Sequence, residues 1–306
     1  MTSGRIKILV TGATGQVGWE LSRTLPTLGQ VVALDREELD LRRTDELKRV
    51  LREMRPDVVI NAAAYTAVDR AESEPELARQ VNAVAPRVLA EQLQSTGGLL
   101  VHYSTDYVFD GTQDRPYTEE NEPAPLSAYG ASKLEGEKAI QAVGGAHLIF
   151  RTSWVYGSRG KNFLLTMLKL FEERSEIRIV DDQIGAPTWC RWLAESTAQV
   201  LTQWIQDQGS AAALAGHRSG IYHMTPAGKT SWFGFATAIL DLQKPEAGAK
   251  RPRLLPIPSA AYPLPANRPA NSVLSNAKLK ATFGVAQPPW DSLLRRCLAE
   301  LTPRTP

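Results

Sequence analysis

Tyr129 and Lys133 are the two residues whose types and spacing point most directly to chemistry. They stand four positions apart at the start of a predicted helix, so both side chains lie on one face of it. A free phenol titrates at about pH 10 and is a poor acid or base at neutral pH. A neighbouring ammonium stabilises the phenolate and lowers the pKa of the tyrosine toward the operating range. The pair therefore predicts proton transfer by Tyr129, tuned by Lys133.

Ser104, Thr105 and Asp106 follow a short apolar run at residues 99–103, which we predict to be a buried strand. In open parallel sheets, reacting groups gather beyond the carboxyl ends of the strands. Thr105 could therefore donate a hydrogen bond to the same oxygen that Tyr129 protonates. This context adds weight to the tyrosine–lysine pair, because that spacing alone often arises by chance.

A glycine-rich loop, TGATGQVG at residues 11–18, predicts a nucleotide-binding turn. Gly12 permits the tight turn out of a strand, and Gly15 lets backbone N–H groups approach a pyrophosphate. Gly18 lets the following helix pack closely on the sheet. An ordinary glycine-rich turn is the alternative. The loop follows a predicted strand and opens a predicted helix, which favours the nucleotide-binding interpretation.

The end of the second predicted strand gives conflicting signals about the cofactor. Asp35 stands 20 residues after Gly15, where an acidic side chain would bind the adenine ribose diol and repel a 2′-phosphate. Arg36 follows immediately and could hold such a phosphate through two hydrogen bonds, or could be a solvated surface charge. NADH and NADPH therefore both remain open.

Two kinds of segment alternate along the first half of the chain. Short β-branched runs at 6–10, 31–34, 58–60, 99–103 and 147–150 are separated by helix-period stretches at 17–28, 45–54, 75–94 and 131–142. Strands and helices at this spacing predict βαβ units, and almost wholly apolar strands predict a sheet covered on both faces. We expect an α/β fold: a doubly wound, Rossmann-like parallel sheet with a second, smaller substrate-binding domain.

The second half of the chain is less regular. Helical patterns recur at 163–173, 189–206, 232–240 and 292–300. Residues 252–269 hold six of the 20 prolines, which predicts an extended path. We expect residues 1–152 to form the dinucleotide-binding domain. Residues 153–306 should mainly bind substrate, with 188–222 returning to the nucleotide domain.

Composition excludes several classes of protein. In 306 residues, 35 Lys and Arg balance 33 Asp and Glu to a net charge of +2, which argues against nucleic-acid or polybasic membrane binding. No apolar run approaches the roughly 18 residues of a membrane span, and no signal peptide is evident, so we expect a soluble cytoplasmic protein. Cys190 and Cys297 are isolated, which argues against a disulfide scaffold or a zinc site. His102 and His147 lie in strand-like runs and are interpreted as satisfied core residues rather than ligands.

Several stretches together resemble the extended short-chain dehydrogenases/reductases and, within them, the dTDP-4-dehydrorhamnose reductases. The wider resemblance rests on the glycine loop, the NAAA run at 61–64, residues 104–106 and the Tyr129/Lys133 pair. The narrower one rests on NAAAYTAVD at 61–69, STDYVFDG at 104–111, RTSWVYG at 151–157, DQIGAPT at 182–188 and RPANSVL at 268–274. These stretches spread over nearly the whole chain.

The resemblance implies reduction of the 4-keto group of dTDP-4-dehydro-6-deoxy-L-mannose to dTDP-L-rhamnose, with NADPH or NADH. Such a step serves cell-surface polysaccharides such as lipopolysaccharide O-antigen. Tyr129 would donate the proton, Lys133 would tune it and hold the nicotinamide ribose, and Thr105 would orient the carbonyl. The implied cofactor ligands, besides this pair and the glycines, are Gln16, Val17, Asp35, Asp40, Leu41, Ala64, Tyr65, Thr66 and Tyr103.

Asp106 and Trp154 would face the sugar nucleotide, although Trp154 could instead be a core aromatic. Arg268 could meet the substrate diphosphate with two hydrogen bonds, or could be a surface turn charge. The resemblance implies that an asparagine at the position of Asn82 can relay protons toward the lysine, but a solvent-facing role is the simpler interpretation. The four acids of residues 69–76 are interpreted as the solvated start of a helix.

Other functions and partners stay open. One alternative is a related nucleotide-sugar epimerase or reductase, and another is a non-catalytic regulatory subunit of the methionine adenosyltransferase type. A homodimer is compatible with the family, and some relatives are thought to dimerise around magnesium. Glu20 and Glu300 could supply carboxylates to such an ion, but Arg191 stands where another acid would help. We therefore assign no metal ligand.

Overall fold

The computed structural model describes residues 5–206, 218–243 and 251–301. At its centre lies a six-stranded sheet with the order β10-β5-β4-β3-β1-β2, in which every neighbouring pair is parallel. The strands are β1 (Lys7–Thr11), β2 (Gln30–Leu34), β3 (Val58–Asn61), β4 (Leu99–Thr105), β5 (His147–Thr152) and β10 (Gly220–His223). The predicted parallel sheet is confirmed, and β10 adds a strand from the second half of the chain.

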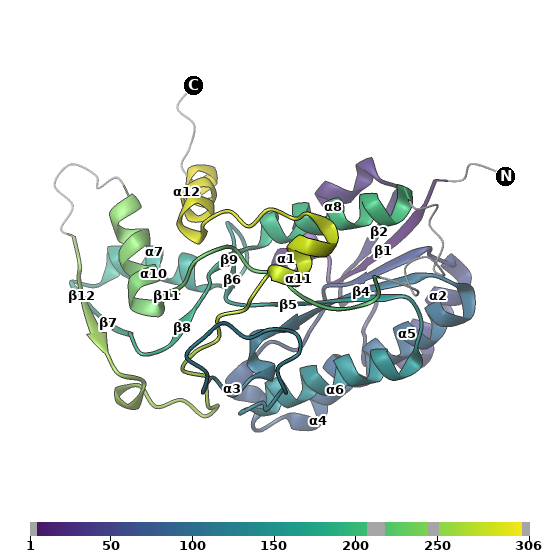
Figure 1. Ribbon diagram of the computed structural model, residues 1–306. Coiled ribbons are helices and arrows are strands. Elements are labelled where there is room, and N and C mark those ends of the chain that lie inside the picture. Colours follow the sequence, from purple (N-terminus) through teal and green to yellow (C-terminus); the bar gives the residue numbers. More distant parts are fainter. Residues whose placement is uncertain (1–4, 207–217, 244–250, 302–306) are drawn as a thin grey trace.

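Helices cover both faces of this sheet (Figure 1). One face carries α2 (Thr44–Met54), α5 (Ala85–Thr96) and α6 (Ala128–Val143), and the other carries α1 (Gln16–Thr24) and α8 (Cys190–Gln206). Successive strand residues feed opposite cores: Leu100 packs with the first group, whereas Leu99 and Val101 pack with the second. The fold is therefore doubly wound, as the apolar strands predict.

The predicted helix over residues 75–94 is interrupted. It is built from α4 (Pro75–Arg79), a π-helical segment (Gln80–Val84) and α5. Asn82 lies in the interruption, fully buried, and binds the backbone N–H and carbonyl of Tyr65 and the hydroxyl of Ser132. A Cβ on Gly136 would lie 2.0 Å from the Asn82 carbonyl oxygen, so α6 packs directly on this segment. The solvent-facing interpretation of Asn82 is wrong, because helix packing encloses it.

The remaining elements gather beyond one end of the main sheet (Figure 1). The helices among them are α7 (Phe163–Glu173), α10 (Trp232–Leu242) and α12 (Trp290–Leu301), and α11 (Ala277–Phe283) packs near β10. Strand β7 (Glu176–Val180) pairs in parallel with β12 (Arg253–Ile257), which occupies part of the proline-rich stretch. The strands β6 (Val155–Tyr156), β8 (Ile184–Gly185), β9 (Thr188–Trp189) and β11 (Thr230–Ser231) form two short pairs.

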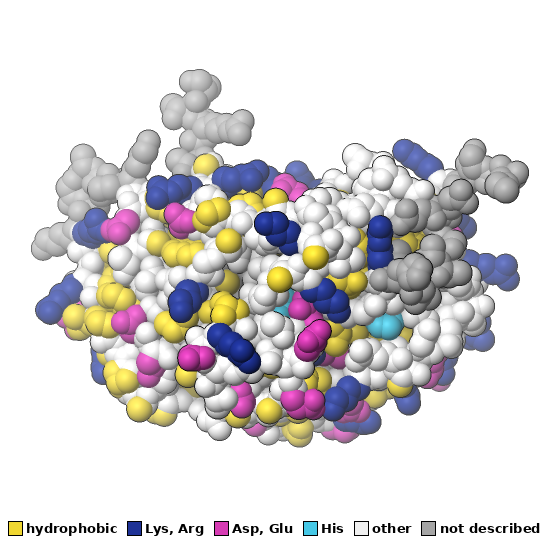
Figure 2. Space-filling view, viewed as in Figure 1, with side chains coloured by type: hydrophobic (Ala, Val, Ile, Leu, Met, Phe, Trp, Pro, Cys, Tyr) yellow, Lys and Arg dark blue, Asp and Glu magenta, His cyan; other side chains and the backbone are white. Residues whose placement is uncertain are grey.

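The surface view shows Lys and Arg side chains interspersed with Asp and Glu on the face drawn (Figure 2). This mixture agrees with the near-zero net charge. Across the described residues, we find no helix with both the length and the apolar character needed to cross a bilayer.

Candidate active site

The glycine loop joins β1 to α1 and leaves a helix N-terminus open. Gly12 has φ of +75°, and a Cβ there would lie 2.9 Å from the backbone of Ala63. A Cβ on Gly18 would lie 2.0 Å from the Gly12 carbonyl oxygen. Gly15 is the N-cap of α1, with no side chain bound to the first-turn N–H groups and no acid among them. These N–H groups and the positive end of the helix dipole suit a pyrophosphate.

The proton-transfer residues come from α6 and from the end of β4. Ser127 caps α6, accepting a hydrogen bond from the Gly130 N–H, and so sets Tyr129 in the first turn. Thr105 ends β4, where its hydroxyl accepts from the Tyr107 N–H at 3.2 Å and donates to Asp106 at 3.0 Å. Tyr129, Thr105 and Asp106 all line one cleft.

Lys133 is buried and points away from bulk solvent. Its Nζ donates to the Tyr103 carbonyl oxygen at 2.6 Å and lies 3.1 Å from Nε2 of His102. His102 is fully buried, which confirms that it is a core residue, and its two ring nitrogens lie within hydrogen-bond distance of Lys133 and Asn61.

Burial dominates the acidity of these groups. It raises the pKa of Tyr129 to about 12, although the Thr105 hydroxyl acts in the opposite direction. It lowers the pKa of Lys133 to about 8, against the charge of Glu137. It raises the pKa of Asp106 to about 7, although hydrogen bonds from Ser272 and Thr105 oppose that shift. The expected lowering of the tyrosine pKa by Lys133 is therefore not found: desolvation of the phenolate raises that pKa, and the charge of Asp106 adds to the rise.

The cleft has a volume of about 880 Å³ and contains most of the sequence-predicted site residues. Its predicted members are Gly12, Gly15, Gln16, Val17, Asp40, Leu41, Ala64, Tyr65, Thr66, Tyr103, Thr105, Asp106, Tyr129, Lys133 and Trp154. The chain positions run from the first strand to the segment after the fifth. The parallel sheet brings them together because most of them lie at or after the carboxyl ends of its strands, and α6 adds Tyr129 and Lys133 at the same edge.

Three predicted residues, Gly18, Asp35 and Arg268, are not among those that line the cleft. Gly18 lies behind the glycine loop, where it permits the close packing described above. One oxygen of Asp35 accepts from the N–H groups of Glu37 and Glu38, at 2.8 and 3.1 Å. The Asp35 carboxylate thus orders the turn after β2.

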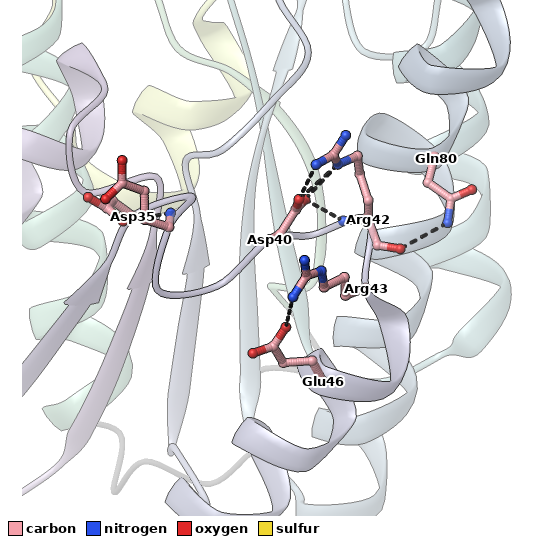
Figure 3. A network of polar contacts seen from close by, with 7 residues as sticks. Asp35, Asp40, Arg42, Arg43, Glu46 and Gln80 are labelled. Atoms are coloured by element: carbon pink, nitrogen blue, oxygen red, sulfur yellow. Dashed lines mark hydrogen bonds and ion pairs between the residues drawn. The ribbon is translucent and has the colours of Figure 1, made fainter.

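Arg36, Asp40 and Arg42 follow the turn of Asp35 and form a charged wall. Figure 3 shows Asp40 and Arg42 of this wall. Arg42 forms an ion pair with Asp40, which holds the pKa of that carboxyl at about 2. The Arg42 carbonyl accepts from the Gln80 amide at 3.2 Å, which ties the wall to the π-helical segment. Arg36 and Arg42 both line the cleft.

Arg268 is bound by Asp69, which lies far from it in the sequence. Its two terminal nitrogens donate to the two carboxylate oxygens at 3.0 and 2.8 Å, and the pairing lowers the pKa of Asp69. Glu74 accepts from the Tyr65 hydroxyl at 2.5 Å. The interpretation of residues 69–76 as a merely solvated helix start is therefore wrong for Asp69 and Glu74, since both have tertiary or local partners.

Trp232 is a cleft residue that sequence reasoning missed. Its ring stacks on Trp154 with centroids 3.6 Å apart and planes 8° from parallel, and its indole N–H donates to Gln183 at 3.2 Å. Trp154 has φ of +47°, and a Cβ on Gly185 would lie 2.5 Å from its ring. Trp232 had only a helical apolar pattern to distinguish it, and that pattern predicts a core residue.

The carboxylates considered for magnesium are bound to an arginine. Arg191 contacts Glu20 at 3.3 Å and also forms an ion pair with Glu300. Among the described residues, no group of three or more His, Cys, Asp and Glu side chains could hold a metal ion. The structure thus gives no support for magnesium.

Comparisons with known sequences point to one family. A family model for the RmlD substrate binding domain matches residues 6–302. The dTDP-4-dehydrorhamnose reductase of Burkholderia thailandensis is 54% identical over 299 residues, which cover 97% of this chain and 99% of the relative. The dTDP-4-dehydrorhamnose reductase of Escherichia coli K12 is 41% identical, with 97% and 98% covered.

Solved structures agree. The dTDP-4-dehydrorhamnose reductase of Bacillus anthracis in complex with NADP has a TM-score of 0.86 and 35% identity, over 97% of this chain and 99% of that one. The UDP-glucose 4-epimerase of Thermus thermophilus in complex with NAD has a TM-score of 0.78, with 98% and 100% covered. At 23% identity, the epimerase shares the fold alone.

Proposed function

This chain belongs to the RmlD family, whose curated members include the dTDP-4-dehydrorhamnose reductases, and from that membership and its cleft we propose its reaction. The protein is an NAD(P)H-dependent oxidoreductase that reduces the 4-keto group of dTDP-4-dehydro-6-deoxy-L-mannose to give dTDP-L-rhamnose. The observation that carries the proposal is the placement of Tyr129, Thr105 and Lys133 in the same cleft as the glycine loop. A non-catalytic role is disfavoured, since this machinery is intact.

The glycine loop and the open N-terminus of α1 fit a dinucleotide pyrophosphate. When bound, the reduced nicotinamide supplies the hydride, an electron pair with its hydrogen, to C4 of the sugar. Tyr129 donates its hydroxyl proton to the former carbonyl oxygen, so that one C–H and one O–H bond form and the ketone becomes an alcohol. Thr105 would position that oxygen by a hydrogen bond when its hydroxyl hydrogen turns from Asp106 to the substrate.

The acidity of Tyr129 suits this direction. With a pKa raised to about 12, the phenol carries its proton at neutral pH and is ready to act as the acid. The alkoxide that develops on the sugar is a stronger base than the phenolate, so the transfer runs downhill. Lys133, at the same edge of the sheet, would hold the nicotinamide ribose.

The cofactor preference rests on the charged wall after β2. Arg36 and Arg42 line the cleft as cations and support NADPH through its 2′-phosphate. Asp35 supports NADH by its position at the end of β2, although one of its oxygens is bound within its own turn. The proposal therefore includes both cofactors. The ratio of the affinities for NADPH and NADH measures whether the arginines or Asp35 set the preference.

Three side chains bear on how the cleft would hold the sugar nucleotide. Trp154, stacked on Trp232, offers an aromatic surface to a deoxysugar or a base. Asp106 is buried and lines the same cleft, with one carboxylate oxygen unpartnered. Arg268 is bound to Asp69, so a diphosphate would share or displace that carboxylate. Its role as a substrate ligand stays a prediction.

We also propose that residues 1–152 form the dinucleotide-binding domain and that residues 153–306 mainly bind substrate. The edge position of β10 in the main sheet and the packing of α8 on α1 support the return of residues 188–222 to the nucleotide domain. A homodimer and a cytoplasmic location also stay predictions.

A coupled assay tests the reaction. We expect purified protein to oxidise NADPH or NADH only when upstream enzymes supply the 4-keto sugar nucleotide. Tyr129→Phe should lower turnover by about 10²–10⁴-fold, because it removes the general acid, with cofactor affinity changed by less than about twofold. Tyr107→Phe is the control, since its ring lies against Tyr129 with centroids 5.8 Å apart, and it should keep most of the turnover. Unchanged turnover in Tyr129→Phe would refute the mechanism, and cofactor binding without oxidation would refute the reaction.

A further inference from the structure

A row of buried polar side chains crosses three strands and ends at Lys133. Thr11 on β1 lies in register with Asn61 on β3, and Asn61 lies in register with His102 on β4. Each of these side chains is at most 1% exposed. Because they occupy equivalent positions of adjacent parallel strands, they point to the same face of the sheet, the face that α6 covers. The proposed reaction mechanism uses none of the three.

The row is continuous in hydrogen-bond distances. The Thr11 hydroxyl donates to Asn61 Oδ1 at 2.7 Å, and Asn61 Nδ2 lies 3.0 Å from His102 Nδ1. His102 Nε2 lies 3.1 Å from Lys133 Nζ. Burying such a row costs free energy unless every member has a hydrogen-bond partner. Because the row ends at Nζ of the catalytic Lys133, we ask what it does for that lysine.

The direction of the hydrogen bonds along the row depends on whether Lys133 is charged. An amide nitrogen has only hydrogens to offer, so in this arrangement His102 Nδ1 accepts from Asn61. A neutral imidazole then carries its hydrogen on Nε2, which donates to Lys133. An ammonium cannot accept a hydrogen bond, whereas a neutral amine can. The arrangement shown therefore matches an uncharged Lys133.

A charged Lys133 requires the opposite arrangement. Nε2 must then accept from the ammonium, the imidazole hydrogen moves to Nδ1, and Asn61 must turn its amide oxygen toward it. The Asn61 amide nitrogen would face the Thr11 hydroxyl, which can accept as readily as it donates. In both arrangements every nitrogen and oxygen of the row keeps at least one partner, so the row can follow the proton on the lysine at the cost of the hydrogen bond that the Thr11 hydroxyl donates.

We propose that His102 is a positioning residue for the reduction: held by Asn61 and Thr11, its neutral imidazole orients Nζ of Lys133, and its tautomer changes with the proton count of that nitrogen. The inference rests on the proposed function, because it assigns a partner to the lysine of that site. His102 touches neither of the reactants and acts through Lys133.

The charges around His102 and Lys133 support a change of the His102 tautomer near the pKa of Lys133. Burial and the neighbouring lysine hold the pKa of His102 well below its ordinary value, so the ring stays neutral throughout. Burial lowers the pKa of Lys133 to about 8, and Glu137, one turn further along α6, opposes that shift. Glu137 is itself bound by Arg151 at 2.6 Å. On the cleft side, the titratable Asp106 and Tyr129 line the same cleft as Lys133.

Nuclear magnetic resonance of the full-length protein with isotope-labelled histidine tests the coupling directly. We expect the His102 ring to carry its hydrogen on Nδ1 below about pH 7 and on Nε2 above about pH 9, with no imidazolium in that range. Replacing each of the other three histidines by glutamine assigns the signal without altering His102. A single tautomer across the range, or protonation of the ring near its ordinary pKa, would overturn the proposal. This measurement needs no sugar substrate, so it can fail or succeed independently of the reductase assignment.

Variants then test the consequence for turnover. His102→Leu removes both ring nitrogens, and we expect kcat to fall about tenfold and the alkaline limb of the pH–rate profile to move by at least half a unit. His102→Gln can still reach Lys133 with an amide and should restore part of both. His147→Gln is the matched control, because His147 stands on β5 of the same sheet and binds the Gly145 carbonyl instead.

The pattern of results separates positioning from packing. A purely structural role predicts lower thermal stability in His102→Leu with an unmoved pH profile, and that outcome contradicts the proposal. Equal profiles for His102→Gln, His147→Gln and the parent protein contradict it as well. Should His102→Leu fail to fold, the tautomer measurement on the parent protein and the profile of His102→Gln decide the question.

Discussion

Asp106→Asn should stabilise the protein, and increasingly so as the pH rises. Asp106 is 2% exposed, and one of its carboxylate oxygens has no partner. Burial raises its pKa to about 7, from an ordinary 3.8 in the unfolded chain. The folded state therefore binds more protons than the unfolded state between these values, and the free energy of unfolding falls as the pH rises. Asparagine keeps an acceptor for Thr105 and never ionises.

The magnitude follows from the two pKa values. Each unit of difference is worth about 1.4 kcal/mol, so a fully ionised Asp106 lowers the free energy of unfolding by about 4 kcal/mol. At about pH 4.5 only about 1 kcal/mol of that loss has developed, because the unfolded aspartate is the species that has begun to ionise. The advantage of Asp106→Asn over the parent protein should thus grow by about 3 kcal/mol between about pH 4.5 and about pH 8.

Urea unfolding of both proteins at the two pH values measures this growth. Asp110→Asn is the control of opposite sign, because the Thr112 N–H and the Tyr117 hydroxyl lower the pKa of Asp110. A lowered pKa stabilises the folded state above the unfolded value, so Asp110→Asn should lose stability relative to the parent as the pH rises. An Asp106→Asn advantage that stays constant with pH would refute the argument, since it would show that Asp106 titrates alike in both states.

Three further perturbations follow from the geometry. Gly18→Ala should abolish NADPH binding measured by fluorescence, because the added Cβ would lie 2.0 Å from a carbonyl oxygen of the glycine loop; binding at parental affinity contradicts the packing argument. Glu137→Gln should lower the free energy of unfolding in urea by about 3–5 kcal/mol, because it leaves Arg151 buried without its counter-charge; a loss below about 1 kcal/mol contradicts it. Trp232→Ala should raise KM for the sugar nucleotide about tenfold, with cofactor affinity unchanged, because Trp154 loses the ring stacked on it; an unchanged KM would separate Trp232 from substrate binding.

The architecture was largely readable from local patterns. Alternating apolar strands and helix-period stretches predicted the doubly wound sheet, because side-chain periodicity reports which faces an element buries. The glycine loop predicted a turn with close backbone contacts, and the Cβ distances at Gly12 and Gly18 explain why glycine is required there. The break of the helix over 75–94 escaped this reading, since it depends on Asn82 meeting Tyr65 and Ser132 from elsewhere in the chain.

Local patterns likewise predicted some features of the site, whereas others required the folded chain. Spacing alone could place Tyr129 and Lys133 on one face of a helix, since a helical turn is a local object. Only the folded chain shows that desolvation raises the tyrosine pKa and that His102 is the partner of the lysine. The stacking of Trp154 on Trp232 joins residues far apart in sequence. Sequence patterns thus determined the elements and their chemical content. The tertiary structure decided partners and acidity, because both depend on contacts and burial between segments that no local period records.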